Sequence, residues 1–294
     1  MHNKLTMIIP AYNEEKSLKV FFPEVVNHCK DQNYKLIIVN DGSTDNTLSF
    51  LEKKLIEFPD AFKIINHKVN RGYGGAIKSG IWASLTDYVI TLDADGQHYL
   101  QDVDNLLNKI IDTNSDLVVG SRKGLLSSSK FRGIGKNIIR FVAKLLMKLP
   151  IYDINSGMKI YDTKLVKSYL HLTPNTMAFS DVITLTFIHN KHLVIEEPIK
   201  IKKRIEGKST IGVRTAFETV LEIINIIVLF NPMRVFLPMS IFFFIFGISW
   251  GSIFFFQGKG LSIGASTLLL ISLIIFLLGL IAEQLSAIRK NQKN

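Results

Sequence analysis

Residues 92–98 read LDADGQH and directly follow the apolar run YVIT at 88–91. The carboxylates of Asp93 and Asp95 stand two positions apart, so in an extended backbone they would share one face. Two close carboxylates repel each other unless a cation lies between them. Hard oxygen ligands of this type suit Mg²⁺ or Mn²⁺, and Gln97 adds a neutral oxygen two positions further on. The segment therefore predicts a divalent cation site, with a simple turn and the acid–base pair of a glycosidase as alternatives.

Strand-like and helical segments alternate through the first half of the chain. The strand-like runs are 5–10, 35–41, 62–67, 87–93 and 116–121. The helical runs are 14–30 (interrupted at Pro23), 43–58, a stretch after Gly75, and 100–113. Short apolar strands separated by helices predict a mostly parallel sheet covered on both faces. Further helices are predicted near 163–171 and 179–190, and strands broken at Pro198 within 192–204.

The unusual polar stretches all follow predicted strands. They are PAYNEE (10–15), NDGSTD (40–45), NHKVNRGYGG (66–75), DADGQH (93–98) and GSR (120–122). Ligands of open α/β sheets bind at the carboxyl ends of the strands. Because these stretches would gather at one edge, we favour a functional role for LDADGQH over a simple turn.

Three of these stretches suggest nucleotide contacts. Gly72, Gly74 and Gly75 precede a helix, where backbone amides and the helix N-terminus favour an anion; a tight turn is the plainer alternative. Asp41 has the acceptors for a base N–H or a ribose hydroxyl. Tyr12 has a ring that can stack on a base.

Two apolar runs without charge, 236–256 and 261–282, lie near the C-terminus. A hydrocarbon core of about 30 Å needs about 20 helical residues, so each run is long enough to span a membrane. The flanking cations are Arg214, Arg234, Arg289, Lys290 and Lys293, whereas the connecting loop holds Lys259. This asymmetry predicts an integral membrane protein whose large N-terminal domain and both termini are cytoplasmic.

The net charge of +10 is placed unevenly, because residues 117–152 contain no acidic side chain. Lys136, Arg140, Lys144 and Lys148 recur every four residues, which predicts a basic helical stripe. Beside a membrane hairpin, this stripe favours attraction to anionic lipid head groups. Nucleic acid is not expected as a partner, because aromatic residues do not interleave with the basic ones.

Taken in order, PAYNEE, VNDGSTD, NRGYGGAI, LDADGQH and SGMKIYD resemble the family-2 glycosyltransferases with a GT-A fold. With two C-terminal spans, the chain is similar to the polyprenyl-phosphate glycosyltransferases, which include the dolichyl-phosphate mannosyl and glucosyl enzymes. The resemblance implies an α/β, Rossmann-like GT-A catalytic domain with a mostly parallel sheet at 1–211. A juxtamembrane amphipathic helix at 212–232 and a transmembrane hairpin with a basic tail at 233–294 would follow.

The resemblance also implies roles for individual residues. Those expected to contact the nucleotide-sugar donor are Pro10, Ala11, Tyr12, Glu14, Asp41, Gly72, Asp93 and Ala94. Asp95 and Gln97 would ligate Mg²⁺ or Mn²⁺. Those expected near the phosphates and the acceptor are Arg122, Arg132, Arg204 and Lys208. The catalytic set would be Asp93, Asp95, Arg122, Asp153 and Asp181, with helix capping as the alternative for Asp181. Lys159 and the stretch RIEGKST (204–210) depart from the family pattern.

The implied reaction is metal-dependent, inverting transfer of a sugar from a UDP- or GDP-linked donor to a polyprenyl phosphate at the cytosolic membrane face. One alternative is a glycosyltransferase for another lipid or a glycan. Another is a non-catalytic, membrane-anchored partner that binds sugar nucleotide. The sequence contains no Q-x-x-R-W motif of processive synthases. It leaves the oligomeric state open, a homo-oligomer included.

Overall fold

The computed structural model describes residues 4–122, 150–154, 156–202, 228, 231–260 and 262–291. The chain forms two compact units. The described part of the first unit lies within residues 4–202 and holds the sheet. The described part of the second lies within residues 228–291 and holds the two apolar helices. The predicted juxtamembrane helix at 212–232 and the basic stretch after Arg122 fall almost wholly outside the described residues.

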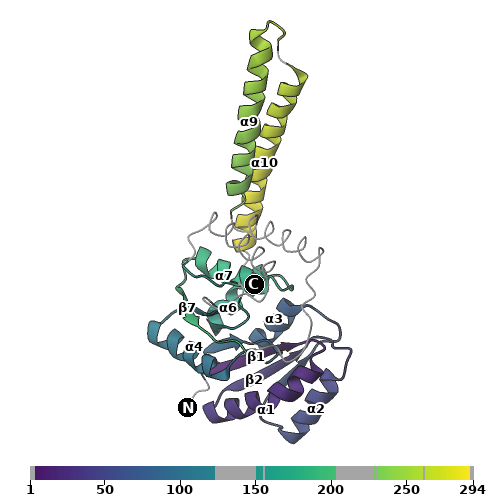
Figure 1. The fold of residues 1–294 in the computed structure, drawn as a ribbon, viewed down its shortest axis with the longest axis vertical. Coiled ribbons are helices and arrows are strands. Elements are labelled where there is room, and N and C mark those ends of the chain that lie inside the picture. Colours follow the sequence, from purple (N-terminus) through teal and green to yellow (C-terminus); the bar gives the residue numbers. More distant parts are fainter. Residues whose placement is uncertain are drawn as a thin grey trace. The chain divides into compact units, whose positions relative to one another are not determined.

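A sheet of seven strands forms the centre of the first unit as far as it is described, in the order β3-β2-β1-β4-β6-β5-β7 (Figure 1). The strands are β1 (Leu5–Ala11), β2 (Lys35–Asn40), β3 (Lys63–Asn66), β4 (Tyr88–Thr91), β5 (Leu117–Ser121), β6 (Lys159–Asp162) and β7 (Val194–Pro198). Neighbours pair in parallel except β6, which runs antiparallel to both β4 and β5. The predicted mostly parallel α/β sheet is confirmed.

Apolar side chains cover both faces of the sheet. Met7 and Ile9 of β1 belong to the core shared with α1 (Glu15–Gln32) and α4 (Leu100–Thr113). On the opposite face, Ile8 lies against Gly80 of α3 (Tyr73–Ala83), where an added Cβ would come within 2.4 Å of Ile8 Cγ2. A strand that is buried on both faces reads as a continuous apolar run, as LTMII does.

The remaining described helices of this unit are α2 (Thr47–Glu57), α6 (Thr163–Tyr169) and α7 (Phe179–His189). The predicted interruption of the first helix at Pro23 is wrong, because α1 continues through it. Proline removes one backbone hydrogen bond. Phe21, Phe22 and Val25 are nevertheless buried on both sides of Pro23, so tertiary packing holds the helix together.

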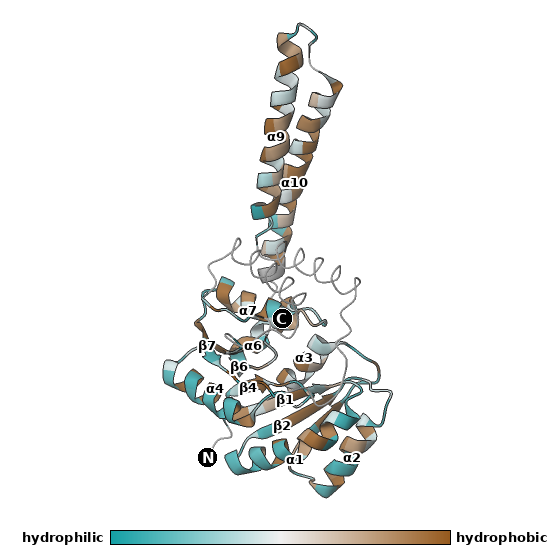
Figure 2. Cartoon of the chain, viewed as in Figure 1, coloured by the Kyte–Doolittle hydropathy of each residue, from teal (hydrophilic) through white to brown (hydrophobic). Residues whose placement is uncertain are grey.

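The second unit is a hairpin of α9 (Met233–Phe256) and α10 (Ile263–Asn291). Both helices are long and apolar enough to cross a membrane, and about a sixth of each apolar window, 17%, is buried inside the protein. Figure 2 shows apolar residues along both helices. The two apolar runs found in the sequence are therefore helical, and their apolar side chains face outward.

Small residues hold the two helices together. The Ser240 hydroxyl donates to the Ser272 carbonyl at 2.9 Å, and the Ser272 hydroxyl donates to the Ser240 carbonyl at 2.9 Å. A Cβ added to Gly279 would come within 2.7 Å of Phe236 Cβ. Small residues at such contacts let two helices approach closely, which is how apolar helices associate in lipid.

Gly279→Ala should therefore lower the free energy of unfolding of the hairpin by about 1–3 kcal/mol, because the added methyl group overpacks the contact with Phe236. Gly264→Ala is the matched control in the same helix, since its Cβ would meet Ser262 Oγ at 3.9 Å, an ordinary contact. The SDS concentration that unfolds the hairpin reports the change, read from Trp250 fluorescence in a Trp82→Phe background. Equal shifts for the two variants would contradict this packing.

Candidate functional site

The polar strand ends lie level at one edge of the sheet. In the register, Ala11 is opposite Asn40, and Asn40 is opposite Asn66, so β1, β2 and β3 end together. Because β6 is antiparallel, the residues that precede Lys159 reach the edge where β4 and β5 end. The expected gathering of the motifs is confirmed, and the segment before β6 joins them.

The loops that follow β1 and β2 are tied together. Asn13 has a positive φ of 56°, and its side-chain oxygen accepts from Thr44 N at 2.8 Å. Glu14 N donates to Thr47 Oγ1 at 3.0 Å. Pro10 and Ala11 end β1 beneath this loop, and the Tyr12 ring is 46% exposed. Tyr12 therefore has a surface on which a planar ligand can stack.

Asp41 is buried and holds the glycine loop. Its Oδ1 lies 2.6 Å from His67 Nδ1 and accepts from Arg71 N at 2.9 Å. Its Oδ2 accepts from Gly72 N at 2.9 Å. His67 Nε2 lies 2.8 Å from Ser79 Oγ of α3. The carboxylate expected at the nucleoside is thus also the anchor of the loop that opens α3.

The glycines of NRGYGG are required by a neighbouring segment of the chain. A Cβ on Gly72 would lie 2.4 Å from the Asn175 carbonyl oxygen, and one on Gly74 would lie 2.4 Å from the Pro174 carbonyl oxygen. Gly75 N donates to the Asn175 carbonyl at 3.3 Å. Close backbone packing accounts for these glycines, so they do not by themselves indicate a phosphate.

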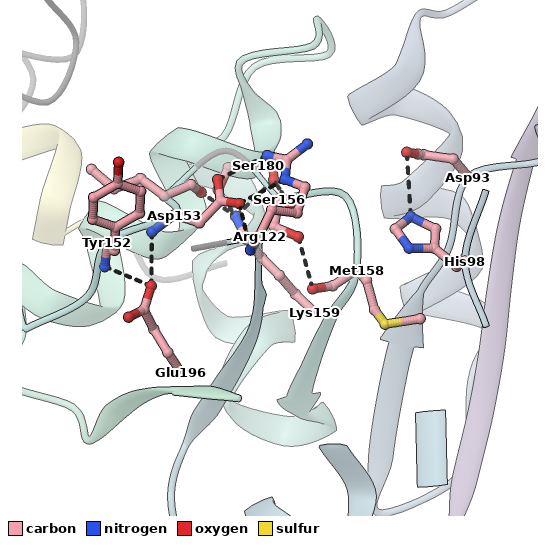
Figure 3. A network of polar contacts seen from close by, with 11 residues as sticks. Asp93, His98, Arg122, Tyr152, Asp153, Ser156, Met158, Lys159, Ser180 and Glu196 are labelled. Carbon is pink, nitrogen blue, oxygen red and sulfur yellow. Dashed lines mark hydrogen bonds and ion pairs between the residues drawn. The ribbon is translucent and has the colours of Figure 1, made fainter. Parts of the chain in front are cut away.

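Asp93 lies where three segments meet. Its Oδ1 accepts from the Tyr73 hydroxyl at 3.1 Å. Figure 3 shows its contact with His98, in which Oδ2 lies 3.7 Å from Nε2. A Cβ on Gly157 would come within 2.5 Å of Asp93 Oδ2, so only glycine leaves room for this carboxylate. Burial alone would raise the pKa of Asp93. The hydrogen bond and charge of His98, the Tyr73 hydroxyl and the charge of Arg122 together hold that pKa below its ordinary value.

The extended backbone expected through 93–95 is wrong. β4 ends at Thr91, and Ala94 and Asp95 form a turn that Gly96 completes with a φ of +69°. Asp95 is buried, and its Oδ1 accepts from Gln97 N at 3.1 Å. Asp95 therefore lies in the turn and Asp93 just before it, and glycine permits the positive φ that completes the turn.

The donor atoms near this turn fit a hard divalent cation. Asp93, Asp95 and Gln97 supply oxygen atoms alone, the preferred ligands of Mg²⁺. Within the described ranges, no three His, Cys, Asp or Glu side chains gather to hold one ion. Mg²⁺ usually takes one or two carboxylates and completes its coordination with water and phosphate oxygens, so the residues present agree with a site shared with a ligand.

Arg122 and Asp153 form a two-pronged ion pair. Arg122 Nε donates to Asp153 Oδ2 at 2.6 Å, and Nη2 donates to Oδ1 at 2.8 Å. The backbone amide of Arg122 also donates to Asp153 Oδ2 at 3.1 Å. Burial alone would lower the pKa of Arg122, but Asp153 raises it. The guanidinium is thus a fixed cation at the end of β5.

Lys159 is fully buried and joins the segment before β6 to α7. Its Nζ donates to the Ile154 carbonyl at 2.5 Å and to the Ser180 carbonyl at 2.6 Å. The hydroxyls of Ser180 and Thr184 each accept at 2.7 Å. Burial lowers the pKa of Lys159 to about 7, although the charges of Asp181 and Asp153 oppose the shift.

Asp181 lies in the first turn of α7, but the N-cap residue of that helix is Ala178. The capping alternative for Asp181 is therefore wrong. Asp181 is buried near Lys159 and Arg122, whose pKa values its charge raises. Arg132, Arg204 and Lys208, expected near the phosphates, lie outside the described residues.

Sequence reasoning did not assign a site role to Tyr73, His98, Gly157 or Lys159. The first two stand inside quoted motifs, NRGYGG and LDADGQH, so their place in the sequence was a usable signal. Gly157 and Lys159 stand in SGMKIYD. Their contacts depend on how β6 enters the sheet, which no local pattern reveals.

Comparison with known proteins agrees with this geometry. Residues 6–170 match the family described as glycosyl transferase family 2, and residues 231–288 match the GtrB C-terminal hairpin. The first match covers more than half of the chain. It confirms the resemblance inferred from the five motifs.

Two curated relatives are dolichyl-phosphate enzymes. The UDP-N-acetylglucosamine--dolichyl-phosphate N-acetylglucosaminyltransferase of Methanococcus voltae is 32% identical over 180 residues, covering 55% of this chain and 70% of that protein. The dolichyl-phosphate beta-glucosyltransferase of Homo sapiens is 30% identical over 176 residues, 54% of each chain.

The glucosyl-3-phosphoglycerate synthase of Mycobacterium tuberculosis, solved with Mn²⁺, UDP-glucose and phosphoglyceric acid, shares the fold. Its TM-score is 0.59 at 15% identity, and the likeness covers 76% of this chain and 79% of that chain. It supports the GT-A fold of the described sheet and helices.

Gly157→Ala should displace Asp93, because the added methyl group needs the space that Oδ2 occupies. We expect sugar transfer to fall by about 100-fold, the scale for a misplaced catalytic group. Steady-state kinetics measure the effect. Asp112→Ala, a change at an exposed residue of α4, is the control. Unchanged transfer in Gly157→Ala would show that Asp93 does not need this position.

The titration of Lys159 should be visible in the pH dependence of stability. The pKa is about 7 in the folded protein and about 10.5 when unfolded, so between these values only the unfolded chain holds the proton. The free energy of unfolding of the wild type should therefore rise with pH across this window, relative to Lys159→Met. Denaturant unfolding at pH 6.5–9.5 measures the difference. For Lys164→Met, a change at an exposed residue, the free energy of unfolding should vary with pH as it does in the wild type. The same pH dependence in Lys159→Met would show that Lys159 does not titrate in this range.

Proposed function

Because the chain belongs to glycosyl transferase family 2, we propose that it transfers a sugar from a nucleotide-sugar donor to a polyprenyl phosphate. Family membership makes it a glycosyltransferase, and its hairpin associates it with a membrane. One observation carries the proposal. Two carboxylates, Asp93 and Asp95, and one guanidinium, Arg122, meet at one sheet edge in a chain with a GtrB-type hairpin.

The donor would lie along the ends of β1, β2 and β4. Tyr12 would stack on the base, with Pro10, Ala11 and Glu14 lining the same loop, while Asp41 and Gly72 shape the floor beside it. Asp93 and Ala94 would contact the donor. Relatives and fold neighbours whose names include UDP support a UDP-linked sugar, and a GDP-linked sugar is the alternative.

A bound Mg²⁺ or Mn²⁺, held by Asp95 and Gln97, would neutralise charge on the donor diphosphate. The turn at Gly96 and the bond from Gln97 N support this role, because they fix the Asp95 carboxylate before a ligand arrives. Asp93 differs from Asp95, since Tyr73 and His98 already engage it.

The acceptor phosphate needs no strong general base. A phosphate monoester has a second pKa of about 6, so it is largely dianionic at pH 7 and can attack the sugar carbon directly. Attack opposite the departing nucleoside diphosphate would invert the configuration at that carbon. Arg122 would hold the attacking phosphate, assisted by Arg132, Arg204 and Lys208. Asp153 would orient Arg122, and the charge of Asp181 behind it would oppose proton loss from Lys159.

The membrane hairpin would keep this site at the interface where a polyprenyl phosphate exposes its head group. The basic residues that flank the two spans support cytoplasmic termini and a cytoplasmic catalytic domain. A lipid acceptor explains why a water-soluble sheet domain and an apolar hairpin occur in one chain.

Purified full-length protein in detergent should form a lipid-linked monosaccharide from one donor of a UDP- and GDP-sugar panel. The assay supplies Mg²⁺ or Mn²⁺ with undecaprenyl or dolichyl phosphate, and mass spectrometry identifies the product. Asp95→Asn keeps the side-chain volume but removes the charge, so transfer should fall by about 100-fold or more, as it should on chelation. Asp112→Asn on exposed α4 is the matched control.

The other results distinguish the alternatives. Donor hydrolysis without lipid product would place the acceptor in another chemical class. Donor binding without turnover by any donor would favour a non-catalytic, membrane-anchored partner.

A further inference from the structure

Glu196 of β7 reaches across to the segment that carries Asp153. Its Oε1 accepts from the backbone amides of Tyr152 at 2.6 Å and Asp153 at 2.8 Å (Figure 3). Hydrogen bonds to an ionised acceptor are shorter and stronger than neutral ones. One carboxylate oxygen thus fixes two successive peptide groups.

The fixed backbone sets the direction of the Asp153 side chain. Asp153 is buried, and both of its carboxylate oxygens accept from Arg122, at 2.6 Å from Nε and 2.8 Å from Nη2. A guanidinium is planar with its N–H groups in a rigid fork, so engaging one edge fixes the direction of the whole group. A rotation of the 152–153 backbone would therefore turn Arg122.

The contacts of Glu196 within the described part of the chain are to backbone amides. Among the described residues, no Lys, Arg or His nitrogen forms an ion pair with Glu196, whereas the next residue, Glu197, pairs with Lys109 Nζ at 3.3 Å. Successive residues of a strand point to opposite faces. The two glutamates therefore have different partners: Glu196 accepts from the amides of residues 152 and 153, and Glu197 pairs with Lys109 of α4.

We propose that Glu196 is a positioning residue for the acceptor phosphate, acting through Asp153 on Arg122. The inference rests on the proposed function, in which Arg122 holds that phosphate. The chain of contacts runs from β7 through the segment before β6 to the end of β5. In this proposal β7, which carries none of the motifs, takes part in acceptor recognition.

The test compares Glu196→Ala with Glu197→Ala in full-length protein in detergent, with undecaprenyl phosphate and the active sugar nucleotide. Glu196→Ala should raise the KM for undecaprenyl phosphate by about tenfold or more, the scale of a lost charge-assisted hydrogen bond. The donor KM should stay unchanged. Glu196→Gln should restore most of the loss, because its amide oxygen can still accept from both amides. Glu197→Ala should leave both KM values unchanged.

A double variant separates positioning from mere stability. If Glu196 acts through Asp153, Glu196→Ala combined with Asp153→Asn should raise the acceptor KM no further than Asp153→Asn alone. Full additivity would overturn the inference, and so would a donor KM that rises as much as the acceptor KM. Equal effects of Glu196→Ala and Glu197→Ala would also overturn it.

Hydrogen exchange of the 150–154 peptide gives a readout independent of activity. Glu196→Ala should speed exchange of the Tyr152 and Asp153 amides, while Glu197→Ala should not. If the wild type makes no lipid product with any donor, the proposed function fails and the acceptor role of Glu196 fails with it. Faster exchange in Glu196→Ala would then still show that Glu196 holds the Tyr152 and Asp153 amides. Unchanged exchange would show that it does not.

Discussion

The buried side chain of Lys159 makes the contacts on which the candidate site depends. It binds the carbonyls of Ile154 and Ser180, and thereby fastens the segment that enters β6 to the start of α7. A charge without solvent is costly unless hydrogen bonds compensate it. Four oxygen acceptors and the nearby carboxylates of Asp153 and Asp181 offset part of this cost, but burial still lowers the pKa of Lys159 to about 7. This junction links the segment that carries Asp153 to the helix that carries Asp181.

The segment 153–157 owes its importance to one antiparallel strand. β6 runs against β4 and β5, so the chain that enters it passes the ends of both neighbours. Thr91 Oγ1 at the end of β4 donates to the Gly157 carbonyl at 2.7 Å, which brings Gly157 against Asp93. A fully parallel strand at this place would have carried the segment to the opposite edge. The mixed sheet thus unites Asp93 with the Arg122–Asp153 pair.

Local sequence patterns were enough for the parallel strands and for the list of strand ends, but not for the antiparallel direction of β6. Apolar runs such as LTMII and KLIIV mark buried strands, and parallel strands must end at one edge. The turn at 94–96 was missed, because Gly96 adopts a positive φ that alternation of side chains cannot reveal. The roles of Lys159 and Glu196 could not be predicted either. Glu196 contacts amides 43 and 44 positions away, and a lysine between Met158 and Ile160 gives no sign that it is buried.

The paired serines of the hairpin have a consequence for how the two helices move. Ser240 and Ser272 each donate to the carbonyl of the other, so both bonds exist in a single alignment of α9 with α10. A slip of one helical turn, about 5.4 Å, would break both together and leave two hydroxyls in an apolar surrounding. The helices therefore resist sliding past each other, and a displacement at one end of the hairpin is carried to the other as the motion of a single stiff rod.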